Sequence, residues 1–194
     1  DSEFNTIPDV IGYNLYGGWY TGTVEQNGED IDDIRKYPQN KPLSLTEYGA
    51  EGILKYHSDH PVVFDYTEEY QLLFHELFYD IIVQKDLWGS FVWNMFDFAS
   101  DSRDEGGMKG MNNKGLVTYD RKTKKESFFF YKCNWNKDEK FVHVCGCRFH
   151  DRATESINVT VLTSSPALNS NLYVYNNDVL VKSVLNNVNI INVF

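Results

Sequence analysis

The sequence is poor in cysteine, and its three cysteines do not form a disulfide framework. An odd number of cysteines in 194 residues leaves at least one thiol without a partner in the chain. Cys145 and Cys147 are separated by one residue, which is closer than in a usual zinc knuckle, and Cys133 has no ligand partner nearby in the sequence. The five histidines share no ligand spacing on one predicted element. The sequence therefore predicts free thiols that are buried or half-buried on strands, and no protein metal site.

Basic residues are also scarce, with 18 Lys and Arg against 28 Asp and Glu. The net charge of −10 and the pI of about 4.9 argue against a surface for nucleic acid or for an anionic membrane. No apolar run approaches the ~20 residues that a membrane-spanning helix needs. The chain has no initiating Met and no visible signal peptide, and we expect it to be a segment of a longer polypeptide.

Hydrophobic spacing over residues 9–136 alternates between the periods of strands and helices. Apolar runs that end in polar or aromatic residues predict strands at residues 9–14, 42–50 and 88–98. Apolar residues three and four positions apart predict helices at about residues 29–37, 67–85 and 124–135. This alternation is typical of parallel β/α units, and three units are less than half of an eight-unit barrel. We therefore predict an α/β fold in which residues 1–137 form part of a (β/α)8 TIM barrel.

The pattern changes after about residue 138. Stretches without helical period predict strands at residues 141–149, 156–162, 172–175 and 179–184. Asn176-Asn177-Asp178 lies between two of them and predicts a hairpin turn, because Asn and Asp tolerate positive φ. We therefore predict that residues 138–194 begin a partial immunoglobulin-like antiparallel β-sandwich.

A carboxylate follows the most strand-like stretch of the first part of the chain. Leu43 and Leu45 alternate with polar residues, and Glu47-Tyr48-Gly49 ends this run. A glutamate at the end of a barrel strand lies at the rim, where a ligand can reach it, whereas the alternative is a solvated or capping carboxylate. The preceding segment Leu15–Tyr20 combines glycines with large aromatics, which predicts either exposed rings at a site or packing of the loop on the core.

Five motifs, taken in order, resemble glycoside hydrolase family 2, the family of β-galactosidases and β-glucuronidases. The motifs are Asp9–Tyr20 (DVIGYNLYGGWY), Leu45–Ala50 (LTEYGA), Thr67–Gln71 (TEEYQ), Phe91–Phe98 (FVWNMFDF) and Asn112–Leu116 (NNKGL), the last continuing to Asp120-Arg121-Lys122. The resemblance covers about residues 9–136 and implies that they form the C-terminal portion of the family's catalytic barrel. The tail resembles the small sandwich that follows the barrel in bacterial β-galactosidases of this type.

The resemblance implies a retaining double displacement, in which two carboxyl groups ~5 Å apart act on the sugar. Glu47 matches the family's nucleophile on the seventh barrel strand. The family's acid/base glutamate follows an Asn at the end of the fourth strand, before the first residue of this chain, so we expect the segment alone to be inactive. Tyr16 matches the tyrosine beside the nucleophile, Tyr20 belongs to the same motif, and Trp93 matches an indole of the sugar pocket.

Asn112 and Lys114 fall where the family shapes substrate specificity. In β-glucuronidases an Asn-x-Lys pair here meets the sugar carboxylate, and lysine is a suitable counter-charge for a uronate. Related β-galactosidases also carry this pair, Gly17 replaces a tyrosine common in glucuronidases, and residues 117–121 look galactosidase-like. The sequence therefore favours a β-galactosidase that hydrolyses terminal β-galactosides. A β-glucuronidase and a non-catalytic carbohydrate-binding or packing module are the alternatives.

The predicted partners are a carbohydrate substrate and the N-terminal remainder of the same polypeptide, and a homo-oligomer is compatible with the sequence. No cofactor is evident. The family resemblance alone would allow Mg or Na, and the sequence contains no recognisable ligand set for either ion.

Overall fold

The computed structural model describes residues 3–36, 41–154, 156–164, 170–186 and 190–193, and the chain forms two compact units. The first unit comprises Asp1–Lys125 and the second comprises Glu126–Phe194. The sequence predicted a domain boundary after residue 137. The helix at residues 126–135 groups with the second compact unit, and the domain boundary stays a prediction.

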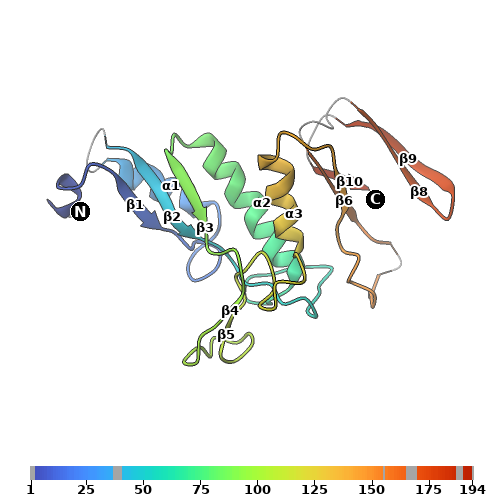
Figure 1. Cartoon of the computed structure of the whole chain (residues 1–194), viewed down its shortest axis with the longest axis horizontal. Coiled ribbons are helices and arrows are strands. Elements are labelled where there is room, and N and C mark those ends of the chain that lie inside the picture. Colours follow the sequence, from blue (N-terminus) through green and yellow to red (C-terminus); the bar gives the residue numbers. More distant parts are fainter. Residues whose placement is uncertain (1–2, 37–40, 155, 165–169, 187–189, 194) are drawn as a thin grey trace. The chain divides into compact units, whose positions relative to one another are not determined.

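A three-stranded parallel sheet runs through the first unit (Figure 1). Its strands, in spatial order, are β1 (Ile11–Asn14), β2 (Leu43–Tyr48) and β3 (Gly89–Val92). Parallel strands that are covered on both faces are apolar along their length, and Leu43, Leu45 and Tyr48 of the central strand are all buried. The predicted alternation of helices with parallel strands is confirmed in this unit.

The helices of the first unit are α1 (Gln26–Arg35) and α2 (Glu68–Gln84), preceded by a short 3-10 helix η1 (Glu3–Thr6). α2 begins after Thr67, whose backbone is extended and whose hydroxyl accepts a hydrogen bond from the Tyr70 N–H at 3.0 Å. Its apolar face packs on the sheet, since the Phe78 ring stacks on Tyr48 with centroids 4.7 Å apart. His75 on this helix is fully buried, and burial lowers its pKa to about 3, so the ring is neutral at neutral pH.

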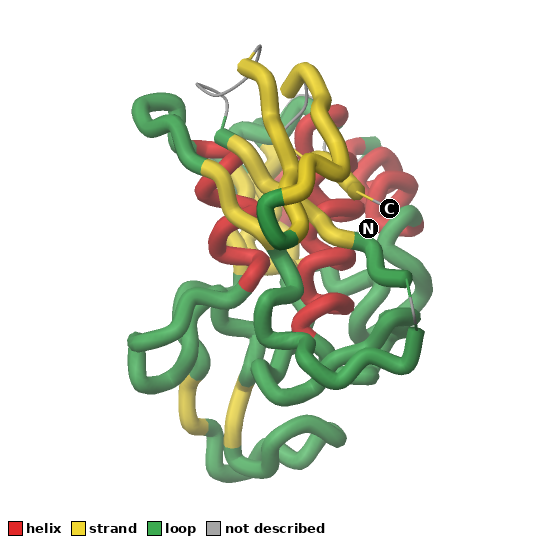
Figure 2. Tube along the Cα trace, turned by 90° about the vertical axis from the view of Figure 1, so that its right-hand side faces the viewer, coloured by secondary structure: helices red, strands yellow, loops and turns green. Residues whose placement is uncertain are grey.

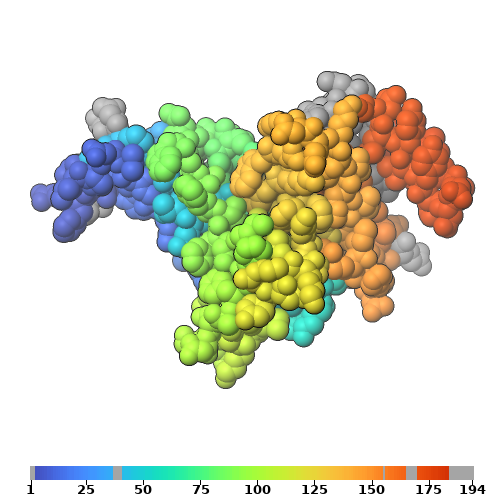
Figure 3. All heavy atoms as spheres, in the orientation of Figure 1, coloured from blue at the N-terminus to red at the C-terminus, as the bar shows by residue number. Residues whose placement is uncertain are grey.

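The segment that follows β3 forms a hairpin that projects from the first unit (Figures 1 and 3). β4 (Phe98–Ala99) pairs antiparallel with β5 (Met111–Asn112), a strand that was not predicted from the sequence. Backbone hydrogen bonds close this hairpin, from the Ser100 N–H to the Gly110 carbonyl at 2.9 Å and from the Gly110 N–H to the Arg103 carbonyl at 2.8 Å. Gly110 has a φ of 74°, a conformation that suits glycine. The closed hairpin brings Arg103 to Tyr20, in the loop that follows β1.

The described residues of the second unit combine a helix with antiparallel strands (Figure 1), and Figure 2 shows the helices and strands of the chain in a second view. Its elements are α3 (Glu126–Trp135), β6 (Val142–Val144), β7 (Val159–Thr163), β8 (Ser170–Asn176), β9 (Val179–Asn186) and β10 (Ile190–Val193). β10, β7 and β6 form one sheet in that order, and β8 pairs with β9. Asn177 and Asp178 have φ values of 46° and 65°, so the predicted hairpin turn is confirmed. Val161 is buried in a small core that includes Leu172 and Val174.

The strand predicted at residues 141–149 is shorter than expected, because β6 ends at Val144 and the chain turns through Gly146, whose φ is 77°. The antiparallel character of the described strands agrees with the sequence, whereas the immunoglobulin-like sandwich and the TIM barrel stay predictions at this level of the fold. Within the described part of the chain, no helix is both long enough and apolar enough to cross a membrane.

Candidate active site

The C-terminal ends of the parallel strands lie together at one edge of the sheet. A backbone hydrogen bond of 2.9 Å joins the Leu15 N–H to the Glu47 carbonyl, and another of 2.9 Å joins the Trp93 N–H to the Tyr48 carbonyl. Parallel strands end on the same side, which is where α/β proteins build their sites. The structure therefore brings Glu47 and Trp93, both singled out from the sequence, to the same rim.

Glu47 is paired with a phenol. The Tyr16 hydroxyl donates a hydrogen bond to Glu47 Oε2 at 2.8 Å, and both residues are half-buried. Burial raises the pKa of Tyr16 well above its usual range, and the hydrogen bond to Glu47 and the charge of Glu47 raise it further. Tyr16 therefore keeps its proton and remains a hydrogen-bond donor, which holds the Glu47 side chain in place. A carboxylate held in this way can attack an electrophilic carbon.

Gly49 allows the ends of β2 and β3 to approach closely. A Cβ atom at this position would lie 2.1 Å from the Trp93 carbonyl oxygen, so only glycine fits without a shift of the backbone. Trp93 is half-buried, and its ring meets Phe98 edge-on with centroids 5.9 Å apart. The indole is thus held against β4 and keeps part of its surface exposed, which suits packing on an apolar face of a ligand.

Lys114 is a buried cation among aromatic rings. Its side chain is 1% exposed, and Nζ lies 4.6, 5.5 and 5.8 Å from the ring centroids of Tyr20, Trp19 and Tyr16. Nζ also donates a hydrogen bond to the Tyr20 hydroxyl at 2.8 Å. Asn112 Oδ1 accepts a hydrogen bond from the Lys114 N–H at 3.0 Å, which fixes the backbone that carries the lysine. The sequence-predicted residues Tyr16, Tyr20, Asn112 and Lys114 therefore belong to one cluster.

Two charged residues of this cluster, Glu51 and Arg103, were not predicted from the sequence. Glu51 is buried, and its Oε1 lies 3.3 Å from Lys114 Nζ and accepts a hydrogen bond from Arg103. Its Oε2 accepts a hydrogen bond from the Asn113 N–H at 3.1 Å. Arg103 Nη2 also donates to the Tyr20 hydroxyl at 3.0 Å. Glu51 directly follows the LTEYGA motif, and this position could have indicated a site residue. Nothing in the sequence distinguished Arg103 from the other charged residues of its loop.

A second buried ion pair supports the segment that follows β5. Lys125 Nζ lies 2.8 Å from Asp97 Oδ1 and donates hydrogen bonds to the carbonyls of Gly52 at 2.7 Å and Asn113 at 2.9 Å. Asp97 Oδ1 also accepts a hydrogen bond from the Gly115 N–H at 2.9 Å. Burial raises the pKa of Asp97 and lowers that of Lys125, while the attraction between the two charges opposes both shifts. This ion pair links the segment after β2, at Gly52, to the segment that contains Lys114.

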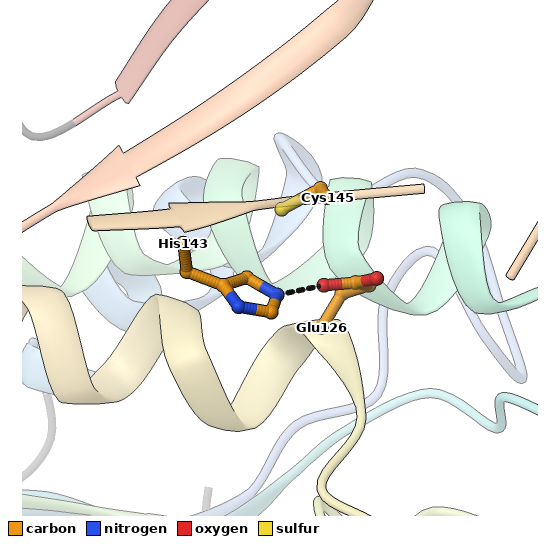
Figure 4. Close-up of side chains that lie close together, drawn as sticks. All are labelled: Glu126, His143 and Cys145. Carbon is orange, nitrogen blue, oxygen red and sulfur yellow. Dashed lines mark hydrogen bonds and ion pairs between the residues drawn. The ribbon is translucent and has the colours of Figure 1, made fainter. Parts of the chain in front are cut away.

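In the second unit, three side chains with metal-binding atoms lie close together (Figure 4). The ligand atoms of Glu126, His143 and Cys145 are all within 4.8 Å of one another, and His143 Nε2 is 2.5 Å from Glu126 Oε2. The other carboxylate oxygen, Oε1, lies 3.2 Å from Arg148 Nη2 and accepts a hydrogen bond from the Gly146 N–H at 3.1 Å. The sequence analysis missed this group because its members come from α3 and from the region of β6. The contacts describe an ion-paired, hydrogen-bonded cluster whose arginine opposes binding of a cation.

Among the residues that the structure describes, the site contains a nucleophile candidate but no recognisable proton donor beside it. A retaining glycosidase needs a second carboxyl group ~5 Å from the first. Glu51 is also buried nearby, but both of its oxygens already accept hydrogen bonds from Arg103, Lys114 and the Asn113 N–H. We therefore assign Glu51 to charge balance, and the location of the acid/base group outside this chain stays a prediction.

No protein-family model matches the chain, but individual proteins match most of its length. A β-glucuronidase of Bacteroides fragilis is 35% identical over 178 residues, which are 86% of this chain and 25% of that protein. The crystal structure of an FMN-binding β-glucuronidase from Faecalibacterium prausnitzii L2-6 is 40% identical, with a TM-score of 0.89, and the match covers 99% of this chain and 29% of that one. A B. fragilis structure with a provisional β-galactosidase assignment is 32% identical, with a TM-score of 0.80, over 93% of this chain and 29% of that one.

These matches correct the substrate preference inferred from the sequence. The similar proteins are mainly β-glucuronidases, so they favour the alternative reading over β-galactosidase. The chain spans a quarter of the length of the B. fragilis β-glucuronidase, so the matches concern one part of such an enzyme. In this part the chain belongs to glycoside hydrolase family 2, the family of β-glucuronidases and β-galactosidases.

Proposed function

We propose that the chain is the nucleophile-bearing part of a retaining β-glucuronidase. The observation that supports this most is the hydrogen bond of 2.8 Å from the Tyr16 hydroxyl to Glu47, at the C-terminal end of a parallel strand. The buried ammonium of Lys114 supports a glucuronide as the substrate, because a sugar carboxylate needs a counter-charge. The parallel sheet would then be part of the family's (β/α)8 barrel, and the second unit would be part of the sandwich that follows it.

In this proposal Glu47 attacks the anomeric carbon of the bound sugar. The bond between that carbon and the leaving oxygen breaks, and an acid from another part of the enzyme protonates the oxygen. Water then hydrolyses the ester between Glu47 and the sugar, with the same outside group acting as base. Tyr16 orients the attacking carboxylate through its hydrogen bond, since its own proton is retained.

Four further residues have proposed roles in binding the sugar. The exposed part of the Trp93 indole would pack on the C–H face of the pyranose ring. Lys114 and the Tyr20 hydroxyl would meet the carboxylate of the glucuronide. Asn112 would hold the lysine segment in place through the hydrogen bond from the Lys114 N–H.

Hydrolysis of a panel of aryl β-glycosides by the complete enzyme tests this proposal. We expect hydrolysis of the β-glucuronide, and we expect Glu47→Gln to lower kcat by roughly 10⁴-fold or more without loss of the fold. A 2-deoxy-2-fluoro glucuronide should leave its label on Glu47, as read by mass spectrometry of the labelled peptide. A label on any other residue would contradict the assignment, and so would normal turnover by Glu47→Gln.

Tyr16→Phe tests the partner of the nucleophile. Removal of one hydrogen bond to a charged group should lower kcat by roughly 10- to 100-fold. Tyr119→Phe is a matched control, because Tyr119 is exposed on the surface and the change also removes only a hydroxyl. Equal kinetics of the Tyr16→Phe and Tyr119→Phe enzymes would show that the phenol plays no part in turnover.

A β-galactosidase is the second candidate, because Asn-x-Lys also occurs in related galactosidases and one similar structure carries that provisional assignment. Lys114→Met separates the two candidates. In a glucuronidase this change should remove activity on glucuronides, whereas a galactosidase should keep its preference for the neutral sugar. The non-catalytic alternative predicts that no glycoside of the panel is hydrolysed.

A further inference from the structure

We propose that Arg103 and Glu51 form a positioning pair that leaves Lys114 available to bind the anionic group of the substrate. The inference rests on the proposed glycosidase function and concerns the choice between an acidic and a neutral sugar. Neither Glu51 nor Arg103 lies in one of the five family motifs. Arg103 lies in the segment between the motifs Phe91–Phe98 and Asn112–Leu116.

Arg103 and Lys114 share the same two acceptors. Lys114 Nζ donates to the Tyr20 hydroxyl at 2.8 Å and lies 3.3 Å from Glu51 Oε1. Arg103 Nη2 donates to the same hydroxyl at 3.0 Å and contacts the same Glu51 oxygen more closely than the lysine does. Arg103 also lies 2.7 Å from Glu105 Oε2, which holds it within its own hairpin. Two cations therefore compete for one carboxylate oxygen and one phenol.

The competition matters because Glu51 is buried. Its side chain is 1% exposed, and a buried charge that loses its only partner is strongly destabilising. If Lys114 were the sole partner, movement of its ammonium toward a ligand would leave Glu51 uncompensated. Arg103 removes this restriction, because it can hold Glu51 alone while Lys114 gives up its longer contact. The arginine thus makes the lysine available without placing itself on the sugar.

Arg103 also sets the charge of the cluster. Glu51 and Glu105 carry negative charges, and Arg103 and Lys114 carry positive charges, so the four side chains together are neutral. Without the arginine the cluster would be negative, and a sugar carboxylate would be repelled. The Tyr20 hydroxyl accepts hydrogen bonds from both cations and donates one to Glu105 Oε2 at 3.2 Å, and Tyr20 is 42% exposed, so the cluster reaches the surface beside Tyr20, where an anionic oxygen can approach Lys114.

The test compares aryl β-glucuronide and aryl β-galactoside hydrolysis by variants of the complete enzyme. Arg103→Met should lower kcat/KM for the glucuronide by roughly 10- to 100-fold through a higher KM, because Glu51 then holds Lys114 and the sugar carboxylate loses one charge-assisted contact. The same change should lower kcat/KM for the galactoside far less. Arg103→Lys should restore much of the difference. Glu51→Gln removes the competing anion, so the ratio of glucuronide to galactoside kcat/KM should rise. Opposite effects of the two changes on this ratio are the signature of the proposed pair.

Lys109→Met is the control within the same hairpin, because this lysine is 80% exposed and its ion pair with Asp104 is 3.5 Å long. It should leave both activities unchanged. If Arg103→Met and Glu51→Gln lower both activities in equal proportion, the two residues only support the fold and the proposal is wrong. Absence of glucuronide hydrolysis by the unaltered enzyme is a different result, since it would overturn the proposed function itself.

Discussion

Replacement of Lys125 by methionine should strongly destabilise the first unit. Lys125 is fully buried, and its ammonium is 2.8 Å from Asp97 Oδ1 and hydrogen-bonded to two backbone carbonyls. Methionine has a similar length and keeps the packing of the stem, so the change mainly removes charge and hydrogen bonding. It leaves the Asp97 carboxylate buried, with only the hydrogen bonds from the Gly115 N–H and Asn113 Nδ2.

The expected loss is about 3–5 kcal/mol in the free energy of unfolding, the range measured when one partner of a buried ion pair is removed. For a unit of this size, this corresponds to a fall in Tm of about 10–15 °C. The loss should lie toward the upper end of this range, because the carbonyls of Gly52 and Asn113 lose their donor as well. Replacing both partners, Asp97→Asn with Lys125→Met, should recover part of it, because no unpaired charge then remains.

Thermal and urea unfolding of the complete protein would measure these changes. Lys122→Met is the matched control, since its ammonium is 81% exposed and 4.0 Å from Asp120, and it should change stability by no more than about 0.5 kcal/mol. A loss below about 1 kcal/mol for Lys125→Met would refute the argument that the ion pair supports the rim. A double variant that is no better than the sum of the single variants would refute the assigned coupling.

Three further predictions concern other parts of the chain. Gly49→Ala should destabilise the protein and lower activity, because the alanine Cβ would lie 2.1 Å from the Trp93 carbonyl oxygen. Unchanged unfolding and unchanged turnover of this variant would contradict the prediction. Thr67→Ala should cost about 1 kcal/mol in urea unfolding, since α2 loses its N-cap hydrogen bond. Burial opposes ionisation of Glu126, but the hydrogen bond and charge of His143 outweigh it and hold the pKa of Glu126 below its usual value. The resulting stabilisation is present above the ordinary glutamate pKa of about 4.3 and is lost as the pH falls through the lowered value, so urea unfolding between pH 7 and 3 should show a decline that Glu126→Gln lacks.

The alternation of the parallel strands and helices could be predicted because each of these elements is marked by local chemistry. Leu43 and Leu45 alternate with polar residues along β2, and the wide apolar face of α2 repeats at helical spacing. The turn at Asn177-Asp178 could be predicted for the same reason, since these residue types tolerate positive φ. The residues at the rim were suggested by the family motifs, and the contact between Tyr16 and Glu47 agrees with that suggestion.

The charge network could not be predicted because it depends on how a polar loop closes. The hairpin between β4 and β5 contains several charged side chains that look alike in the sequence. Pairing of the Ser100 N–H with the Gly110 carbonyl determines that Arg103 is the one directed to Glu51. The cluster of Glu126 and His143 was missed for a related reason, because its members are brought together by the packing of α3 and β6 rather than by spacing.

The parallel sheet of the first unit has a practical consequence. Within the described residues, β1 and β3 are each hydrogen-bonded to β2 on one side only. Trp88, directly before β3, and Phe91, within it, are 54% and 50% exposed. Edge strands with unpaired backbone N–H and C=O groups can pair with other extended chains. Produced alone, this polypeptide should therefore self-associate or bind chaperones.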